Sequence, residues 1–434
     1  MNRPLVKYLV SSPYGDITVD KRKWHLPLEG DALKTPYKRY FYSIRDFLLR
    51  DELKPLLRAT SKKLGREIHM REVTEIIVRS EKHGFLYHPA SIEVVLKKGK
   101  VKFGLNVAIS EMGKKWLREE FSVLNHLNKK FNLPYLPRPY IFEELNAMSF
   151  LLEDWFEGYH EFHMSKDEEG KQRLKLWNFG DSRSGYTYLS SEQNFEIYKQ
   201  AAKILTFYYD LKDYSQILNW HHAAGDFVVK IKDKKVDVRL TTARRYEPLM
   251  VFRETEPINP FLALFYFFLH LTIKMHLDKL DGLGETVWMN DLCLEATVTG
   301  FLEALQMKNP AASRRVSNIK KLPSFPDLPA LDSDRGIGES RTKELDSLVK
   351  PENDTRKPCG KPQGIIKFKK EFEPYPGFID EFLRLLETFE EEELKIAFTP
   401  LLDLYNGQED YSVVMANLEN HTRKLYTILQ NHPL

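Results

Sequence analysis

The chain has 434 residues, too many for one ordinary hydrophobic core, so two or three domains are expected. Hydrophobic residues make up 42% and charged residues 29%, as in most soluble globular proteins. The 65 basic and 62 acidic side chains leave a formal charge of +3, which gives no electrostatic reason to expect a nucleic-acid partner.

Signals for secretion, disulfides or a membrane span are not found in the sequence. The two cysteines, Cys293 and Cys359, support neither a disulfide framework nor a cysteine-based metal site. The first residues lack the apolar run of a signal peptide. The most apolar segment, residues 261–273, is shorter than the ~20 residues that a membrane span needs. We therefore expect a cytoplasmic protein that does not enter a membrane.

Residues 1–66 are expected to form a helical N-terminal extension. Apolar residues between positions 44 and 57 recur at the spacing of an amphipathic helix. Basic and aromatic residues are interleaved just before them, at positions 37–42. Such a mixture could contact nucleic acid, but it more often forms the solvated face of a helix, which is the interpretation that we favour.

Residues 67–156 show the pattern of three strands, one helix and two further strands. The third strand, at 101–109, alternates apolar and polar residues, which indicates one buried face. Apolar residues then follow helical spacing until prolines end the pattern. The predicted strands are 74–78, 91–96, 101–109, 140–144 and 148–156, and the helix is 113–131.

Residues 157–308 contain helices and one predicted hairpin. Residues 157–192 are polar and lack periodicity, so we expect a connection or an excursion there. Two β-rich runs, 227–231 and 236–242, flank a polar four-residue turn and predict a hairpin. Asn259 followed by Pro260 is a good start for a buried apolar helix. Further helices are predicted at 194–211 and from near residue 290.

The C-terminal part divides into a linker and a helical appendage. Residues 309–376 contain nine of the 23 prolines and charges of both signs, which is typical of a linker. Residues 377–434 predict two amphipathic helices, which could bind a protein partner.

The order of elements from residue 68 to 308, more than half of the chain, resembles the kinase-like fold of the aminoglycoside phosphotransferase and choline kinase branch. The resemblance implies an α+β, two-lobed protein-kinase-like fold. Its small lobe, residues 67–156, would have five strands, and its large lobe, residues 157–308, would be helical. The C-terminal helices would be an appendage, and the implied cofactors are ATP and magnesium.

Two motif positions of that family can be compared at the small lobe. Val107-Ala108-Ile109-Ser110 looks like the V-A-I-K signature, with Ser110 in place of the phosphate-pairing lysine. On the following helix, Glu119 or Glu120 would match the carboxylate partner of that lysine.

At the catalytic loop, the family pattern H-G-D-x-x-x-x-N can be aligned in two ways. Alignment on the strand places Asp226 at the metal-binding asparagine and His221 at the catalytic aspartate; we prefer it because it keeps the strand in register. The other alignment makes Asp226 the catalytic aspartate and leaves Ile231 at the metal-binding position. The second metal carboxylate is replaced by threonines at 241 and 242. These substitutions argue against ordinary kinase chemistry.

Two clusters could have other functions. His221, His222 and Asp226 could form a metal site or a catalytic group, or one imidazole could bond within the core while Asp226 caps the local turn. Arg239, Arg244 and Arg245 could bind a phosphorylated ligand, or they could be solvated or paired with nearby glutamates.

The sequence therefore leaves two functions open. The first is a catalytically degraded kinase-like module that binds a small molecule, a nucleotide or a protein and acts in regulation. The alternative is an ATP-dependent small-molecule phosphotransferase whose rearranged site uses Asp226 and a histidine.

Overall fold

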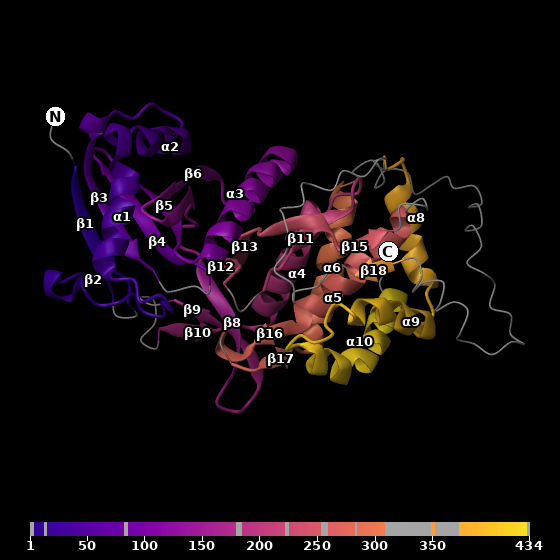
Figure 1. Ribbon diagram of the computed structural model, residues 1–434. Coiled ribbons are helices and arrows are strands. Elements are labelled where there is room, and N and C mark those ends of the chain that lie inside the picture. The colour runs from indigo at the N-terminus through magenta and orange to yellow at the C-terminus, as the bar shows by residue number, and fades with distance from the viewer. Residues whose placement is uncertain are drawn as a thin grey trace, which may run out of the picture. The chain divides into compact units, whose positions relative to one another are not determined.

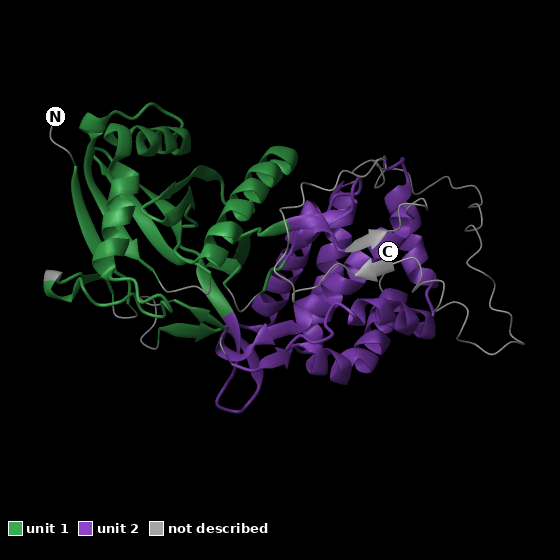
Figure 2. Cartoon of the chain, viewed as in Figure 1, with its two compact units in different colours: residues 1–162, 175–188, 219–245 green, residues 163–174, 189–218, 246–434 purple. Residues whose placement is uncertain are grey.

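The chain divides into two compact units in the computed structural model (Figure 2). The first unit gathers residues 1–162, 175–188 and 219–245, and the second gathers 163–174, 189–218 and 246–434. The structure describes residues 4–12, 15–81, 86–178, 185–221, 225–252, 259–282, 284–308, 349–351 and 373–431. Most of the predicted linker, residues 309–376, lies outside these ranges.

A seven-stranded sheet in the order β2-β1-β3-β4-β5-β7-β6 forms the centre of the first unit (Figure 1). β1 runs parallel to β3, and the other described neighbours are antiparallel. The strands are β1 (Leu5–Val10), β2 (Ile17–Thr18), β3 (Val73–Ser80), β4 (His88–Leu96), β5 (Lys100–Ala108), β6 (Pro139–Leu145) and β7 (Met148–Asp154).

All five strands predicted between residues 67 and 156 are present, with the predicted helix between β5 and β6. The prediction of five strands is nevertheless wrong for the sheet as a whole, because residues 1–66 add β1 and β2. β1 pairs with β3 across more than sixty residues. No local turn signals such a parallel pairing, which explains why the sequence pattern did not reveal it.

Two helices of the N-terminal segment, α1 (Tyr37–Leu49) and α2 (Lys54–Leu64), belong to the first unit. α1 packs on the sheet, with the ring of Phe47 stacked on Phe150 at 4.9 Å between centroids. Every second residue of β5 enters this core, as the alternation predicts. The residues between them, Lys102, Gly104 and Asn106, therefore belong to the opposite face of the sheet.

The helix after β5 is α3 (Glu111–Phe131). The Oγ of Ser110 accepts a hydrogen bond from the backbone N–H of Gly113 at 3.0 Å and so caps the helix. A side chain at Gly113 would lie 2.5 Å from the carbonyl oxygen of Leu86, so the close packing at this point requires glycine.

The predicted hairpin is confirmed as β12 (Phe227–Lys232) and β13 (Lys235–Leu240). Its turn residues, Asp233 and Lys234, have positive φ values of 49° and 67°, as tight hairpin turns require. Residues 157–192, for which the sequence predicts a connection or an excursion but no strands, contain β8 (His160–Lys166), β9 (Gln172–Trp177) and β10 (Tyr186–Tyr188). These strands continue the hairpin into a sheet in the order β10-β9-β8-β12-β13. Many residues of these strands are polar and only partly buried, so the sequence does not show the apolar pattern that predicts a strand.

The second unit is mainly helical. Its helices are α4 (Ser191–Tyr208), α5 (Pro260–His276), α6 (Asp291–Lys308), α8 (Phe378–Thr388), α9 (Glu391–Leu402) and α10 (Tyr411–Asn431). Short strand pairs join β11 (Ser215–Leu218) to β14 (Arg245–Pro248), β15 (Met250–Phe252) to β18 (Val349–Pro351), and β16 (Leu277–Lys279) to β17 (Thr286–Trp288). The chain is therefore a mixed α+β protein with a helical C-terminal part.

Aromatic packing around α5 holds the C-terminal part in place. Asn259 caps α5 as predicted, accepting from the N–H groups of Phe261 and Leu262. Phe261 stacks on Phe378 at 4.6 Å, and Phe265 stacks on Phe389 at 4.4 Å. The C-terminal part has three helices where the sequence predicts two, because α9 begins at an acidic run that also suits a solvated face. None of the helices in the described ranges is long and apolar enough to cross a membrane.

Candidate functional site

The two ends of the β12–β13 hairpin are tied together beside Asp226. Gly225, with a positive φ of 70°, turns the chain into Asp226 directly before β12. After β13, the backbone N–H of Thr241 donates to the carbonyl oxygen of Asp226 at 2.7 Å. The Thr241 hydroxyl also donates to the Gly225 carbonyl at 3.0 Å. The segment after β13 is therefore fixed next to the start of β12.

Asp226 is the centre of this arrangement. Its side chain is 1% exposed, and both carboxylate oxygens accept hydrogen bonds from Arg244, at 2.8 and 3.0 Å. The backbone N–H of His221 donates to the same carboxylate at 2.8 Å. The contact with Arg244 is the two-pronged geometry in which a guanidinium binds a carboxylate most strongly.

Arg244 keeps its charge in this buried setting. Burial alone would lower the pKa of its guanidinium, but Asp226 and Glu120 outweigh that effect and raise it above its usual value. Arg244 also donates to the backbone carbonyl of Asn219 at 3.2 Å. The side chain thus acts as an internal cation with three acceptors.

Glu120, on α3, extends the polar cluster. Its side chain is fully buried, and the hydroxyl of Thr242 donates to one of its oxygens. Burial raises the pKa of Glu120, while Arg244, Thr242 and Tyr87 lower it; the net direction is upward.

Glu153, on β7, is the second buried acid next to this cluster. Burial and the neighbouring Glu120 raise the pKa of Glu153 well above its usual range. Asn106 of β5 donates to Glu153 at 2.9 Å. Burial thus disfavours the charged form of both glutamates, whereas Asp226 has a direct counter-charge in Arg244.

The surroundings of Asp226 bear on its predicted role as a metal ligand. A cation already occupies both of its oxygens, and its side chain is almost fully inaccessible to water. Across the described ranges, no group of three or more His, Cys, Asp or Glu residues is arranged to hold a metal. An ion could coordinate Asp226 only after displacing Arg244.

The other predicted site residues lie in different surroundings. Arg239, on β13, donates to the hydroxyl of Tyr159, to the Pro134 carbonyl and to Asp237, at 3.0–3.1 Å. Arg245 begins β14, and His221 contributes its backbone N–H to Asp226. His222 lies outside the described residues. Asp226, Arg244 and Glu120 come together, whereas Arg239 binds a different set of partners.

Four residues of the cluster were not predicted as site residues: Tyr87, Asn106, Glu153 and Thr242. Two of them carry a usable signal in the sequence. Glu153 follows three apolar residues of a buried strand, and Asn106 interrupts the apolar end of another. An acid or amide inside a strand buried on both faces needs a partner, so such positions indicate an internal polar cluster.

Comparison with known proteins adds no assignment to these residues. No protein-family model matches the sequence, and a search of curated proteins finds no match.

Proposed function

We propose that this chain is a kinase-like module that has lost catalysis and acts as a ligand-binding or regulatory protein. The proposal is supported by the order of elements in β3-β4-β5-α3-β6-β7, followed by α4, the β12–β13 hairpin and the apolar helix α5. That order is the one in which the sequence resembles the aminoglycoside phosphotransferase and choline kinase branch.

The main support for a loss of catalysis is the ion pair between Asp226 and Arg244. Phosphoryl transfer needs magnesium, which is held through carboxylate oxygens. Both oxygens of Asp226 bind the guanidinium instead. Removing Arg244 from them would leave a buried, unpaired charge, which costs about 3–5 kcal/mol.

The other substituted positions of the motif have structural roles. Ser110, where the resemblance places a phosphate-pairing lysine, caps α3. Thr242, in the segment where a second metal carboxylate is expected, binds Glu120. These contacts stabilise the fold without needing a nucleotide.

Nucleotide binding with and without magnesium tests the proposal. We expect millimolar magnesium to leave the melting temperature unchanged, and ATP to stabilise the protein no more with magnesium than without it. A ligand at 100 times its Kd adds about 2.7 kcal/mol to the free energy of unfolding, so specific binding would be visible. A parallel assay would measure release of γ-phosphate from ATP.

Two results would overturn the loss of catalysis. One is stabilisation by ATP that depends on magnesium, and the other is phosphate release above the level without protein. Either result would favour the alternative, a phosphotransferase with a rearranged site that uses Asp226.

A further inference from the structure

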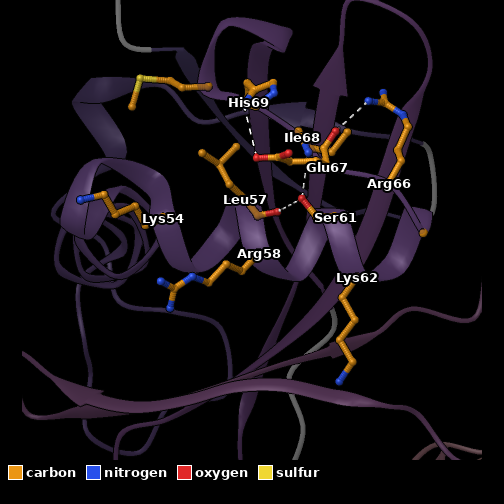
Figure 3. Close-up of a pocket in the computed structure, with 11 residues that line it drawn as sticks. Lys54, Leu57, Arg58, Ser61, Lys62, Arg66, Glu67, Ile68 and His69 are labelled. Carbon is orange, nitrogen blue, oxygen red and sulfur yellow. Dashed lines mark hydrogen bonds and ion pairs between the residues drawn. The ribbon is translucent and has the colours of Figure 1, made fainter.

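A hollow of about 710 Å³ lies along α2 in the first unit (Figure 3). One wall comes from α2, and the other comes from the segment between the end of α2 and β3. The residues that line it are Lys54, Leu57, Arg58, Ser61, Lys62, Gly65, Arg66, Glu67, Ile68, His69 and Met70.

The lining is strongly basic. Four of its side chains are cationic and one is a carboxylate, although the whole chain is nearly balanced in charge. Arg66 pairs with Glu72 at 2.9 Å, so its charge is partly neutralised. Among the described residues, Lys54 and Arg58 have no carboxylate partner, and Lys62 lies 5.6 Å from the ring of Tyr140.

These three cations form a row along α2, at positions 54, 58 and 62. Like charges four residues apart repel each other on a helix and make it less stable. All three are exposed, so they contribute nothing to the core. Lys62 lies in the last turn of α2, where a cation is favourable, but Lys54 and Arg58 add only repulsion to the helix. An anionic partner would remove that repulsion.

The spacing of the row fits an extended acidic peptide. Four residues of an α-helix rise about 6 Å. In an extended chain, side chains two residues apart lie on the same side and are separated by about 6.7 Å. Acidic residues at alternate positions would therefore meet successive cations of the row. The partly exposed apolar residues Leu57 and Met70 offer contacts for side chains between the acids.

Other anionic partners fit this surface less well. Single-stranded nucleic acids bind through basic grooves that also carry aromatic side chains for base stacking. The lining contains no Phe, Tyr or Trp. A membrane surface would meet a flat or convex basic face, whereas this one is a hollow.

From the charge and spacing of this groove, we infer that α2 and residues 65–70 form a docking site for an extended acidic segment of a partner protein. The site takes peptides in which Asp or Glu alternates with other residues. The inference does not depend on the function proposed above, because the groove contains none of the residues Asp226, Arg244, Glu120 and Glu153.

The test measures binding of a short fluorescent peptide with glutamate at alternate positions and leucine or alanine between them. The groove variant is Lys54→Gln/Arg58→Gln/Lys62→Gln in the full chain. A matched control, Lys23→Gln/Lys98→Gln/Lys129→Gln, removes the same charge at exposed positions of the first unit outside the groove. Because the change relieves repulsion on α2, the groove variant should melt no lower than the wild type.

We expect the groove variant to bind the peptide at least about ten-fold more weakly, since several ion pairs are lost together. The control variant should bind like the wild type. A peptide with the same composition but its glutamates in one block should bind the wild type more weakly.

The inference fails if the groove variant binds the alternating peptide as well as the control does, or if the wild type does not bind it. It also fails if oligothymidylate, phosphatidylserine vesicles or inorganic phosphate bind the wild type more tightly than the peptide and lose that binding in the groove variant. Those outcomes would assign the groove to nucleic acid, to membranes or to a single anion.

Discussion

At the scale of single residues, the Asp226–Arg244 pair depends on two side chains that lie 18 positions apart in the sequence. The sequence identifies Asp226 and Arg244 as candidates through clusters of titratable residues, and Glu120 through its motif position in the kinase-like resemblance. Their pairing could not be predicted, because it depends on how the hairpin brings Gly225 and Thr241 together. The sequence leaves open whether Arg244 binds a phosphorylated ligand, is solvated or pairs with nearby glutamates; in the structure its guanidinium binds Asp226.

Replacement of Asp226 tests this pair. Asp226→Asn should lower the free energy of unfolding by about 3–5 kcal/mol, because it leaves the charge of Arg244 buried without a partner. Arg244→Gln should cost a similar amount, since it leaves the Asp226 carboxylate buried. The double variant should be more stable than the sum of the two single changes predicts, with a coupling of about 1–3 kcal/mol. Urea denaturation of the four proteins at pH 7 gives these values.

If the double variant loses as much free energy of unfolding as the two single variants together, the two side chains do not stabilise each other. An Asp226→Asn protein as stable as the wild type would show that the carboxylate is accessible to water. In that case the site would be open to a metal ion.

At the scale of elements, local patterns predict the strands that alternate and the helices that carry caps. β5, α5 and the β12–β13 hairpin follow directly from alternation, from Asn259-Pro260 and from a polar turn. β1 and β8–β10 were not predicted. β1 shows no period-two apolar pattern, and β8 has two apolar residues among polar ones although four of its seven residues are buried. Their existence depends on pairing with distant strands.

The packing of α10 against α5 involves two buried histidines. Nδ1 of His276 donates to the Met289 carbonyl at 2.9 Å, and His421 hydrogen-bonds to the hydroxyl of Thr272 at 3.0 Å. Burial lowers the pKa of His276 to about 4, and burial together with His276 lowers the pKa of His421 well below its usual range. Both rings are therefore neutral in the folded protein at pH 6.

Acid should weaken this packing. As the pH falls from 6.5 towards 4, the unfolded chain binds protons at these two histidines and the folded chain does not, so the free energy of unfolding decreases. His276 alone would account for about 3 kcal/mol over that range. Asp278 has the opposite effect on the free energy of unfolding. Burial raises its pKa to about 6, so as the pH falls the folded chain binds a proton at Asp278 before the unfolded chain does.

Thermal denaturation between pH 4.5 and 7.5 checks this expectation. His276→Phe should flatten the pH dependence, because the unfolded variant has one proton fewer to bind. His25→Phe, a change at an exposed position, should leave the dependence as it is in the wild type. Equal slopes in the wild type and in His276→Phe would rule out His276 as the source.

At the scale of the whole molecule, length predicts more than one domain, but each unit is assembled from three separate stretches of chain. Local sequence patterns do not signal such a division, because contacts between residues far apart in the chain decide it. The C-terminal helices are a clear case: α8 and the residue after it contact α5 through stacked rings more than a hundred positions away.

Limited proteolysis tests this assembly. The density of prolines and charges predicts that residues 310–376 are cut first, leaving a resistant fragment that ends near Gln306. Because Phe378 and Phe389 stack on α5, the two pieces should elute together in gel filtration and separate only in denaturant. First cleavage within residues 68–300, or separation of the pieces in native buffer, would contradict the expectation.

Because Phe265 stacks on Phe389, this contact can form only after the ribosome has made residue 389. The partner ring is made 124 residues after Phe265, and a ribosome adds roughly 5–20 residues per second. This part of α5 consequently stays without its cover for about 6–25 s in every newly made chain. A chain released before Phe389 is added would have exposed aromatic rings, and such a protein is a typical target for chaperones and for degradation.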